Sequence, residues 1–399
     1  MNDKRNFSRR NFIGISGVAS AGLAFSSSPL IAQSVVNGDS NSGKKYKIGI
    51  VGCGNRSKNI IGALNSVPEI EISALCDIVE HKMGLRAALI KNGHKPRFYT
   101  DMHQMFKQDD LDAIAVITPN YTHREYVIAA LEAGKHVFCE KPMALTVADC
   151  NLMIDAVKRT HKSLQIGTQR RHSSDYKMLV ENIRTKINGK ILYSDLFDYR
   201  GDWRAPEADE YPAGVGYWRL DQSKSGGVVY EMGAHIIDVN NWIFDSEPVS
   251  VSSIQGINNL SLRKRDSMDH AGVLVRYAND ALMNYGSNVY NYGAAAADTF
   301  FGVNGSVQMG SGQISIKYGN PKGVAQQGLV IPKPELISLP GGNPEGEGVI
   351  QELKHFALVL AGKEKAYPDG YIARQTVQIC EASVRSAKER REIDVKELG

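Results

Sequence analysis

A short apolar strand that runs straight into a glycine-rich turn is the feature that most constrains the fold of this chain. The strand is expected over Lys47–Val51, the turn over residues 52–57, and a helix from Asn59 to Leu64. In such a unit the first glycine permits a tight turn, the second lets backbone approach a pyrophosphate, and the helix N-terminus presents unpaired N–H groups. Ser57 replaces the usual third glycine and is small enough for close packing. The turn predicts a dinucleotide site contacted by Gly52, Gly54, Asn55 and Arg56.

A carboxylate at the end of the next strand supports this prediction. That strand is expected over Glu71–Cys76, and Asp77 follows it, 25 residues after Gly52. A carboxylate in this place accepts both ribose hydroxyls of NAD and repels the 2′-phosphate of NADP. The alternative role for Asp77 is an N-cap of the following helix. We expect NAD as the cofactor.

Two later segments resemble a known family. A strand over Ala113–Ile117 leads into T-P-N-Y-T-H at residues 118–123, and residues 134–142 read G-K-H-V-F-C-E-K-P. Together they resemble the glucose-fructose oxidoreductase, inositol dehydrogenase and rhizopine catabolism (Gfo/Idh/MocA) family, from about Tyr46 to the C-terminus.

The resemblance assigns residues to the reactive end of the cofactor. It implies that the first segment lines the nicotinamide and its ribose through Thr118, Asn120 and His123. It also implies that Glu140 and Lys141 reach the same end, with Pro142 often cis. Both segments follow parallel strands, at whose carboxyl ends open α/β sheets bind ligands. A solvent-exposed lysine at a strand end is the alternative for Lys141.

The pattern changes after residue 168. Period-two runs at residues 191–199, 249–254, 272–277 and 313–317 predict strands, and helical patterns are fewer. We predict an α/β protein with a Rossmann domain (a doubly wound parallel sheet) at 46–168. An α+β domain follows at 169–399, with an open, mostly antiparallel sheet and helices on one face. The resemblance implies that the outer face of this sheet is a subunit interface, so we expect a homo-oligomer.

Residues 226–238 resemble the family segment that carries a catalytic histidine, and His235 falls on that position. Many family members have Asp four residues earlier, where this chain has Glu231, whose carboxylate is displaced by one methylene. A spacing of four places both side chains on one face if the helix already covers Glu231. A capped or core histidine is the alternative for His235. The predicted catalytic residues are Lys141, His235 and Glu231.

The junction between the two predicted domains and an insertion in the second domain supply further candidate binding residues. Gln169 and Arg170 are expected to reach a cofactor phosphate or a substrate carboxylate, with surface salt bridges as the alternative. The insertion at residues 200–224 holds aromatic and basic side chains suited to stacking on sugar rings and to pairing with acidic groups, although an interface loop would use the same residues. The predicted substrate contacts are Trp203, Arg204, Tyr217, Trp218, Arg219 and, farther along the chain, Tyr290.

The first 32 residues have the features of a targeting signal. Arg9 and Arg10 precede Phe12 and a mildly apolar stretch rich in Gly, Ala and Ser, which resembles a twin-arginine export signal. An unstructured basic tail is the alternative. Residues 33–45 read as a linker, and the chain offers no segment of about 20 apolar residues for a stable membrane span. We expect a periplasmic protein that meets the twin-arginine export machinery with its cofactor already bound.

Composition excludes other partners and sites. The net charge is +4, but residues 1–32 hold four basic and one acidic side chain, so the remainder carries +1. A nearly neutral body argues against nucleic acid as a partner. The five cysteines show neither CxxC spacing nor an even number, so no metal site and no disulfide framework are predicted.

Three functions follow from these features. The first is net hydride exchange between NAD and a hydroxyl or ketone of a sugar, uronate or glycoside, in carbohydrate catabolism outside the cytoplasm. The second is a redox-neutral, NAD-dependent glycoside hydrolase, since the arginine-bearing glycine turn is similar to that of such enzymes. Glu140-Lys141-Pro142 favours the first function. A non-catalytic sugar-binding protein is the third, and the presence of Lys141, His235 and Asp77 argues against it.

Overall fold

A computed structural model describes residues 43–91, 95–187, 190–201, 217–258, 265–290, 293–319, 333–340 and 344–399. The predicted export signal lies outside these ranges. Among the helices that the structure describes, none combines the length and the apolar character needed to cross a bilayer.

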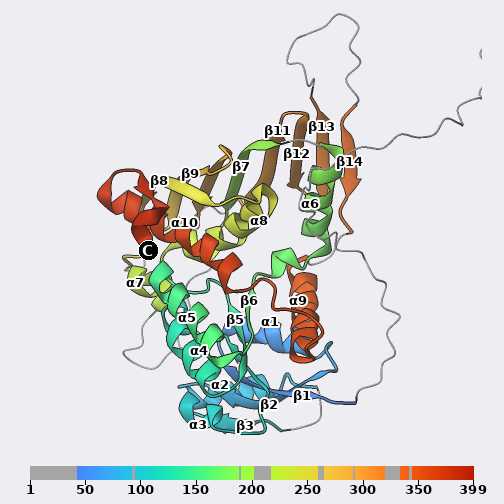
Figure 1. Ribbon diagram of the computed structural model, residues 1–399, viewed down its shortest axis with the longest axis vertical. Helices are drawn as coiled ribbons and strands as arrows, with labels where there is room; N and C mark the ends of the chain where they lie inside the picture. The colour runs from blue at the N-terminus through green and yellow to red at the C-terminus, as the bar shows by residue number, and fades with distance from the viewer. Residues whose placement is uncertain are drawn as a thin grey trace, which may run out of the picture. The chain divides into compact units, whose positions relative to one another are not determined.

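Six parallel strands form the first sheet, in the order β3-β2-β1-β4-β5-β6 (Figure 1). The central strands are short apolar runs buried on both faces, as expected where crossover helices cover a parallel sheet. The predicted doubly wound sheet is confirmed. The strands are β1 (Tyr46–Val51), β2 (Ile70–Cys76), β3 (Arg97–Tyr99), β4 (Ala113–Val116), β5 (His136–Glu140) and β6 (Leu164–Gly167), joined by helices α1 (Asn55–Leu64), α2 (Glu80–Ala87), α3 (Met102–Phe106), α4 (His123–Glu132) and α5 (Val147–Thr160).

Nine strands form the second sheet, in the order β14-β13-β12-β11-β7-β10-β9-β8-β15. Neighbours are antiparallel except β7 and β10, which run parallel, so the predicted mostly antiparallel sheet is confirmed. The strands are β7 (Ile191–Tyr199), β8 (Pro248–Gly256), β9 (His270–Tyr277), β10 (Leu282–Asn288), β11 (Ala295–Gly302), β12 (Gly305–Gly310), β13 (Gln313–Tyr318), β14 (Glu335–Ser338) and β15 (Ile393–Asp394).

Three helices lie on one face of the second sheet: α6 (Ser174–Lys186), α8 (Ala234–Phe244) and α10 (Gly370–Glu389) (Figure 1). Alternate residues of the strands point at these helices and are buried, among them Val273, Val275 and Tyr277 of β9. The period-two pattern in the sequence therefore records which side of each strand meets the helices.

The helix α9 (Pro344–Leu360) packs on the first sheet, although it follows the strands of the second. Its Phe356 lies 5.8 Å from Phe138 of β5, measured between ring centroids, and Val349 and Leu353 join the same apolar cluster. The predicted division at residue 168 put this segment with the second sheet. Amphipathic periodicity predicts the helix but does not say which sheet its apolar side covers.

A buried ion pair follows the last strand of the first sheet. The short 3₁₀ turn η2 (Gln169–Arg171) carries Arg171, whose Nε donates to the Asp238 carboxylate of α8 at 2.7 Å. Both side chains are almost completely buried, and Arg171 also lies against Tyr367. A buried charge of either sign is tolerated only when it is paired, so this contact ties η2 to α8.

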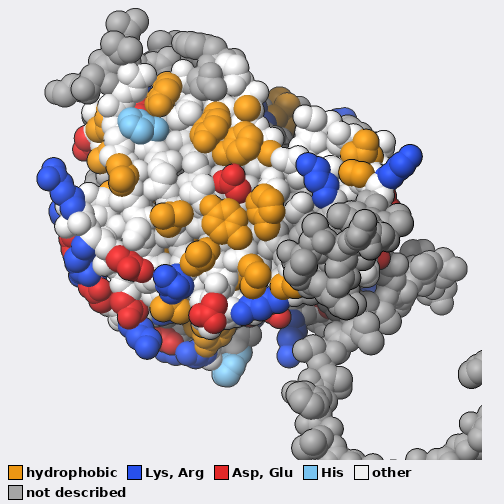
Figure 2. Space-filling view, turned by 90° about the horizontal axis from the view of Figure 1, so that it is seen from above, with side chains coloured by type: hydrophobic (Ala, Val, Ile, Leu, Met, Phe, Trp, Pro, Cys, Tyr) orange, Lys and Arg blue, Asp and Glu red, His pale blue; other side chains and the backbone are white. Residues whose placement is uncertain are grey.

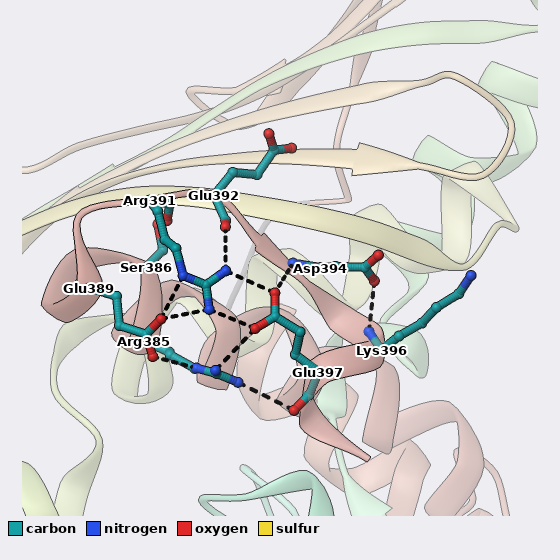
Figure 3. A network of polar contacts seen from close by, with 8 residues as sticks. All are labelled: Arg385, Ser386, Glu389, Arg391, Glu392, Asp394, Lys396 and Glu397. Carbon is teal, nitrogen blue, oxygen red and sulfur yellow. Dashed lines mark hydrogen bonds and ion pairs between the residues drawn. The ribbon is translucent and has the colours of Figure 1, made fainter.

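An ion network fastens the C-terminal residues to the end of α10 (Figure 3). Arg391 binds Glu397 through two nitrogens, at 2.9 and 2.6 Å, and reaches Glu389 at 2.7 Å. Its hydrogen bond lowers the pKa of Glu397 to about 2. The network holds β15 beside β8, where it completes one edge of the second sheet.

The opposite face of the second sheet is exposed and partly apolar. Figure 2 shows hydrophobic side chains scattered over it with few charged groups between them. Side chains on this face alternate along the strands with the buried ones, and several are large: Ile254, Leu274, Leu282, Phe301 and Leu336. A surface of this kind is typical of a protein contact site.

Candidate functional site

A cavity of about 540 Å³ runs along the carboxyl ends of strands β1, β2, β4 and β5 and reaches the residues around α8. It is therefore built from segments far apart in the sequence. Its volume is within the usual range for small-molecule sites, and its position is the one at which open α/β sheets bind ligands.

The glycine turn forms one wall. Gly52 has φ +93°, and a Cβ there would lie 2.4 Å from the carbonyl oxygen of Ile117, so only glycine fits. No atom lies within 4 Å of a Cβ placed on Gly54, which leaves its backbone open to the cavity. Ser57 donates to the Gly54 carbonyl at 2.6 Å and accepts from Arg86 at 3.0 Å. The serine thus braces the turn in place of the third glycine.

The first helix begins earlier than the sequence pattern indicated. It starts at Asn55, with Gly54 as N-cap, rather than at Asn59. The error arose because polar residues fill the first turn, where an apolar periodicity gives no signal. The earlier start directs the free N–H groups of the helix at the cavity, where Asn55 and Arg56 are also found.

Asp77 lies at the other end of the cavity and is held by backbone. One carboxylate oxygen accepts from the Cys53 N–H at 2.7 Å and the other from the Val79 N–H at 2.8 Å. The N-cap of α2 is Val79, so Asp77 does not take the alternative capping position. Its carboxylate is fixed where a ribose would lie if a pyrophosphate bound at Gly54.

A second carboxylate connects the glycine turn with β5. Arg56 donates from Nε to the buried Glu140 at 2.6 Å. Glu352 of α9 lies in the same electrostatic environment, and burial, followed by the charge of Glu140, raises its pKa well above the ordinary value. Glu140 therefore orients Arg56 within the cavity wall, and the peptide bond after the next residue, Lys141-Pro142, is cis.

Glu231 is the centre of the polar contacts at the reactive end. Its carboxylate accepts from Asn120 Nδ2 at 2.7 Å and from Arg219 Nε at 3.1 Å. Lys141 Nζ donates to the backbone carbonyl of Glu231 at 2.8 Å. These contacts join the T-P-N and E-K-P segments to the turn before α8, where Glu231 lies 111 residues after Asn120 and 90 after Lys141.

His235 lines the same cavity, and its Nδ1 has no hydrogen bond to Glu231. Residues 229–233 form a π-helical turn before α8, and this wider turn changes the angle between residues four apart. His235 Nδ1 is buried and has no hydrogen-bond partner among the described residues. The spacing of four residues therefore does not bring the Glu231 carboxylate to His235, since that carboxylate is engaged by Asn120 and Arg219 instead.

Burial disfavours an added proton on both His235 and Lys141. Burial, then the cations of Lys141 and Arg170, lower the pKa of His235 well below its ordinary value. Burial likewise lowers the pKa of Lys141, while Glu231 and Glu140 oppose this shift. The imidazole is therefore neutral near neutral pH, and the residue lines the cavity.

The remaining predicted residues divide into three groups. Those that line the cavity include Thr118, Gln169, Arg170, Trp218 and Arg219. Tyr217 and Tyr290 are exposed and are not part of the cavity wall, and the ring of Tyr290 contacts His270 instead, so these two predictions are corrected. Trp203 and Arg204 lie outside the described residues.

The predicted position of His123 is also corrected. It is fully buried beneath the loops and does not line the cavity. Its Nδ1 lies 2.8 Å from the carbonyl oxygen of Pro142, and its Nε2 lies 3.0 Å from that of Thr118. His123 therefore joins the two strand-end segments from below, a role that a family motif cannot distinguish from cofactor contact.

Several cavity residues gave no signal in the sequence. Asp198 and Arg200 form an ion pair at the end of β7, and Met232 lies in the π-helical turn. At the adenosine end the wall includes Lys82 and Tyr126. Period two could have indicated an inward-facing carboxylate at Asp198, since this residue continues the series of Ser194 and Leu196, which are buried.

The residues present fit an NAD molecule. The glycine turn leaves open space beside Gly54, Asp77 is fixed for ribose hydroxyls, and Thr118, Asn120 and Lys141 surround the opposite end. No cluster of three or more metal-ligating side chains occurs among the residues that the structure describes.

Two family models match this sequence. Residues 46–168 match "Oxidoreductase family, NAD-binding Rossmann fold", and residues 180–395 match "Oxidoreductase family, C-terminal alpha/beta domain". The chain belongs to the Gfo/Idh/MocA oxidoreductase family. The prediction of NAD as the cofactor is confirmed by this assignment.

Curated relatives match part of the chain. Inositol 2-dehydrogenase of Salmonella typhimurium is 32% identical over 203 residues, which are 50% of this chain and 55% of that protein. A glycosyl hydrolase family 109 protein of Shewanella baltica is 28% identical over 247 residues, covering 56% and 53% of the two chains. The match spans about half the length of these relatives.

Solved structures share the fold. A probable dehydrogenase from Thermotoga maritima has a TM-score of 0.69 at 23% identity and covers 88% of this chain and all of its own. A levoglucosan dehydrogenase, in complex with NADH and levoglucosan, has a TM-score of 0.75 at 20% identity over the same shares. Similarity at this level supports the two-sheet architecture.

Asp77 generates a test of cofactor preference. We expect NAD to bind at least about 10²-fold more tightly than NADP, because apposing like charges costs several kcal/mol. Asp77→Asn removes the charge but keeps the shape, so the preference should fall by about tenfold or more. Calorimetric titration with both dinucleotides measures this, and Asp101→Asn, at an exposed helix cap, is the control. Equal binding of NADP by the unaltered protein would contradict the assignment.

Proposed function

We propose that this protein is an NAD-dependent oxidoreductase that exchanges hydride with a CH–OH carbon of a sugar, uronate or glycoside. One observation carries the proposal: the neutral His235, with a buried and unpartnered Nδ1, shares a cavity with the Lys141 ammonium and the glycine turn. This combination offers a proton acceptor and a fixed cation beside a dinucleotide site. The inositol 2-dehydrogenase relatives support the same class of reaction.

In this mechanism His235 acts as general base. A hydroxyl placed against the cavity-facing side of the ring loses its proton to the imidazole while the carbon gives up hydride, for which NAD is the acceptor. A base whose proton affinity is low still works here, because Lys141 stabilises the developing alkoxide and makes the hydroxyl more acidic. The oxygen is held between the two groups, so its position and its acidity are controlled together.

A hydrogen bond to the backbone fixes the position of the Lys141 ammonium group. Its Nζ donates to the Glu231 carbonyl at 2.8 Å, which leaves the other ammonium hydrogens for a substrate oxygen. Glu231 is a positioning residue in this account, since its carboxylate holds Asn120 and Arg219 at the cavity wall. A proton relay through Glu231 is not part of the mechanism.

Loss of either reactive group should slow turnover. Lys141→Met and His235→Ala are each expected to lower kcat by at least about 10²-fold while NAD still binds, the usual size of a general acid–base contribution. Steady-state kinetics and a dinucleotide titration of each variant measure this. Lys158→Met and His103→Ala, at exposed sites outside the cavity, are matched controls.

The pH profile checks the same assignment. The base works only above the pKa of His235, which is lowered from about 6.5, and Lys141 must remain protonated below its own lowered pKa. We therefore expect kcat/KM to be flat near neutrality and to fall only at a pH well below the ordinary histidine range. In the residual activity of Lys141→Met the acid limb should move to higher pH, because a neighbouring cation has been removed. Full turnover in both variants would refute these roles.

A redox-neutral glycoside hydrolase is the second candidate. The glycosyl hydrolase family 109 relatives favour it, since they match this chain at 28% identity over 247 residues. The two functions differ in their products: net oxidation accumulates NADH in proportion to product, whereas a redox-neutral cycle cleaves the glycoside and accumulates none. The intact E-K-P motif supports net oxidation.

We also propose export by the twin-arginine route to the periplasm. The paired Arg9 and Arg10 before an apolar, glycine-rich stretch support it, as does the fact that this machinery carries folded, cofactor-loaded proteins. Replacing both arginines by lysine should leave the protein in the cytoplasm, as measured by cell fractionation with NAD content of the purified fractions. Undiminished export of that variant would overturn the proposal.

We propose further that the exposed face of the second sheet forms a homo-oligomer. Its support is the set of large apolar side chains on that face, including Leu274, which is 55% exposed. Leu274→Glu should shift the molar mass in light scattering toward the monomer, because a charge would be buried between copies. Leu152→Glu, at an exposed position on α5, is the control. A monomeric unaltered protein, or an unchanged mass in Leu274→Glu, would contradict this interface.

A further inference from the structure

A second cavity of about 370 Å³ adjoins the first and takes no part in the mechanism above. It lies between the second sheet and the elements that cover it. Strands β7 and β11, the β12–β13 turn, η2, α6 and α8 supply its wall. The charged and aromatic residues among them are Arg170, Asp175, Tyr176, Asp198 and Asp298.

The two cavities share part of their wall. Arg170 and Asp198 line both, and Ile236 of the second cavity directly follows His235 of the first. The Arg170 guanidinium lies 5.1 Å from the centre of the Tyr176 ring. The two cavities are therefore adjacent, with Arg170 and Asp198 at their border.

Small residues create this space. Four consecutive alanines occupy residues 294–297, where a strand usually carries β-branched or aromatic side chains. Ala296 pairs with Asp198 across β11 and β7. Opposite, a Cβ on Gly310 would lie 3.5 Å from the Ala296 carbonyl oxygen, and a Cβ on Gly312 would meet nothing within 4 Å. Larger side chains here would fill the cavity.

The wall of the second cavity contains both hydrogen-bond acceptors and hydrogen-bond donors. Asp198 and Asp298 are almost fully buried and line this cavity together with Arg170. Burial raises the pKa of Asp298 to about 6, a sign that this carboxyl is costly to desolvate. Sugar hydroxyls both donate and accept, so they satisfy such a mixed wall without adding charge, and 370 Å³ is within the range of small-molecule sites.

We propose that the substrate is a glycoside of at least two sugar units, with the oxidised ring at His235 and the second unit in the cavity beside Ala296. This inference rests on the proposed function for the identity of the first ring. The second unit adds binding contacts without touching the reacting atoms, so it lowers KM and leaves the chemical groups unchanged.

Ala296→Phe tests the proposal by filling the second cavity. The probes are cellobiose, maltose and lactose as two-unit sugars and glucose as the single unit, each with NAD-loaded protein. We expect a two-unit sugar to have a KM at least about tenfold below that of glucose in the unaltered protein. Ala296→Phe should abolish this advantage and leave the KM for glucose and kcat within about twofold. Ala295→Phe, on the same strand but outside both cavities, is the matched control.

Calorimetric binding of the same sugars separates this inference from the proposed function. Binding of a two-unit sugar that Ala296→Phe weakens, with no NADH formed, would keep the second cavity as a sugar site and refute the oxidoreductase. Oxidation of a two-unit sugar that Ala296→Phe does not affect would refute the second cavity alone. Tighter binding of glucose than of every two-unit probe, or binding of no probe, also overturns the inference. Melting temperatures of both variants establish that each is folded.

Discussion

The carboxylate of Glu231 is the contact on which the reactive end of this protein depends. It is buried, so it is stable there only while Asn120 and Arg219 satisfy it. Because Asn120 follows a strand of the first sheet and Glu231 precedes a helix of the second, the hydrogen bond holds the two parts in one arrangement. The backbone carbonyl of Glu231 also accepts a hydrogen bond from Lys141 Nζ and so fixes the position of the ammonium group. One residue, Glu231, therefore positions Asn120, Arg219 and Lys141.

Much of this arrangement could be predicted from the sequence. Gly52 and Asp77 have roles that elementary geometry requires, one in a positive-φ turn against Ile117 and one at the end of a strand. Alternation of apolar and polar residues gave β7 at its observed bounds, Ile191–Tyr199, because one side of that strand meets helices and the other does not. The sequence pattern is enough to predict a residue's position where that position depends on a single strand or turn.

The predictions that were wrong concern residues whose positions depend on contacts between segments far apart in the sequence. The spacing of four residues would place Glu231 and His235 on one face of an ordinary helix, and the π-helical turn at residues 229–233 changes that direction. His123 carries the family motif but spans two carbonyl groups below the cavity. Asp198 and Arg200 were missed because a charged pair at a strand end looks like surface until the fold places it in a cavity wall.

The central claim, that His235 and Lys141 act on a sugar hydroxyl beside NAD, is tested most directly by product analysis. The purified protein is incubated with NAD and a panel of sugars, uronates and glycosides, and mass spectrometry of the products is compared with NADH absorbance. This account predicts a product two hydrogens lighter than its substrate, with one NADH formed for each. Cleavage of a glycoside without net NADH, or no change of mass in any sugar, would contradict it.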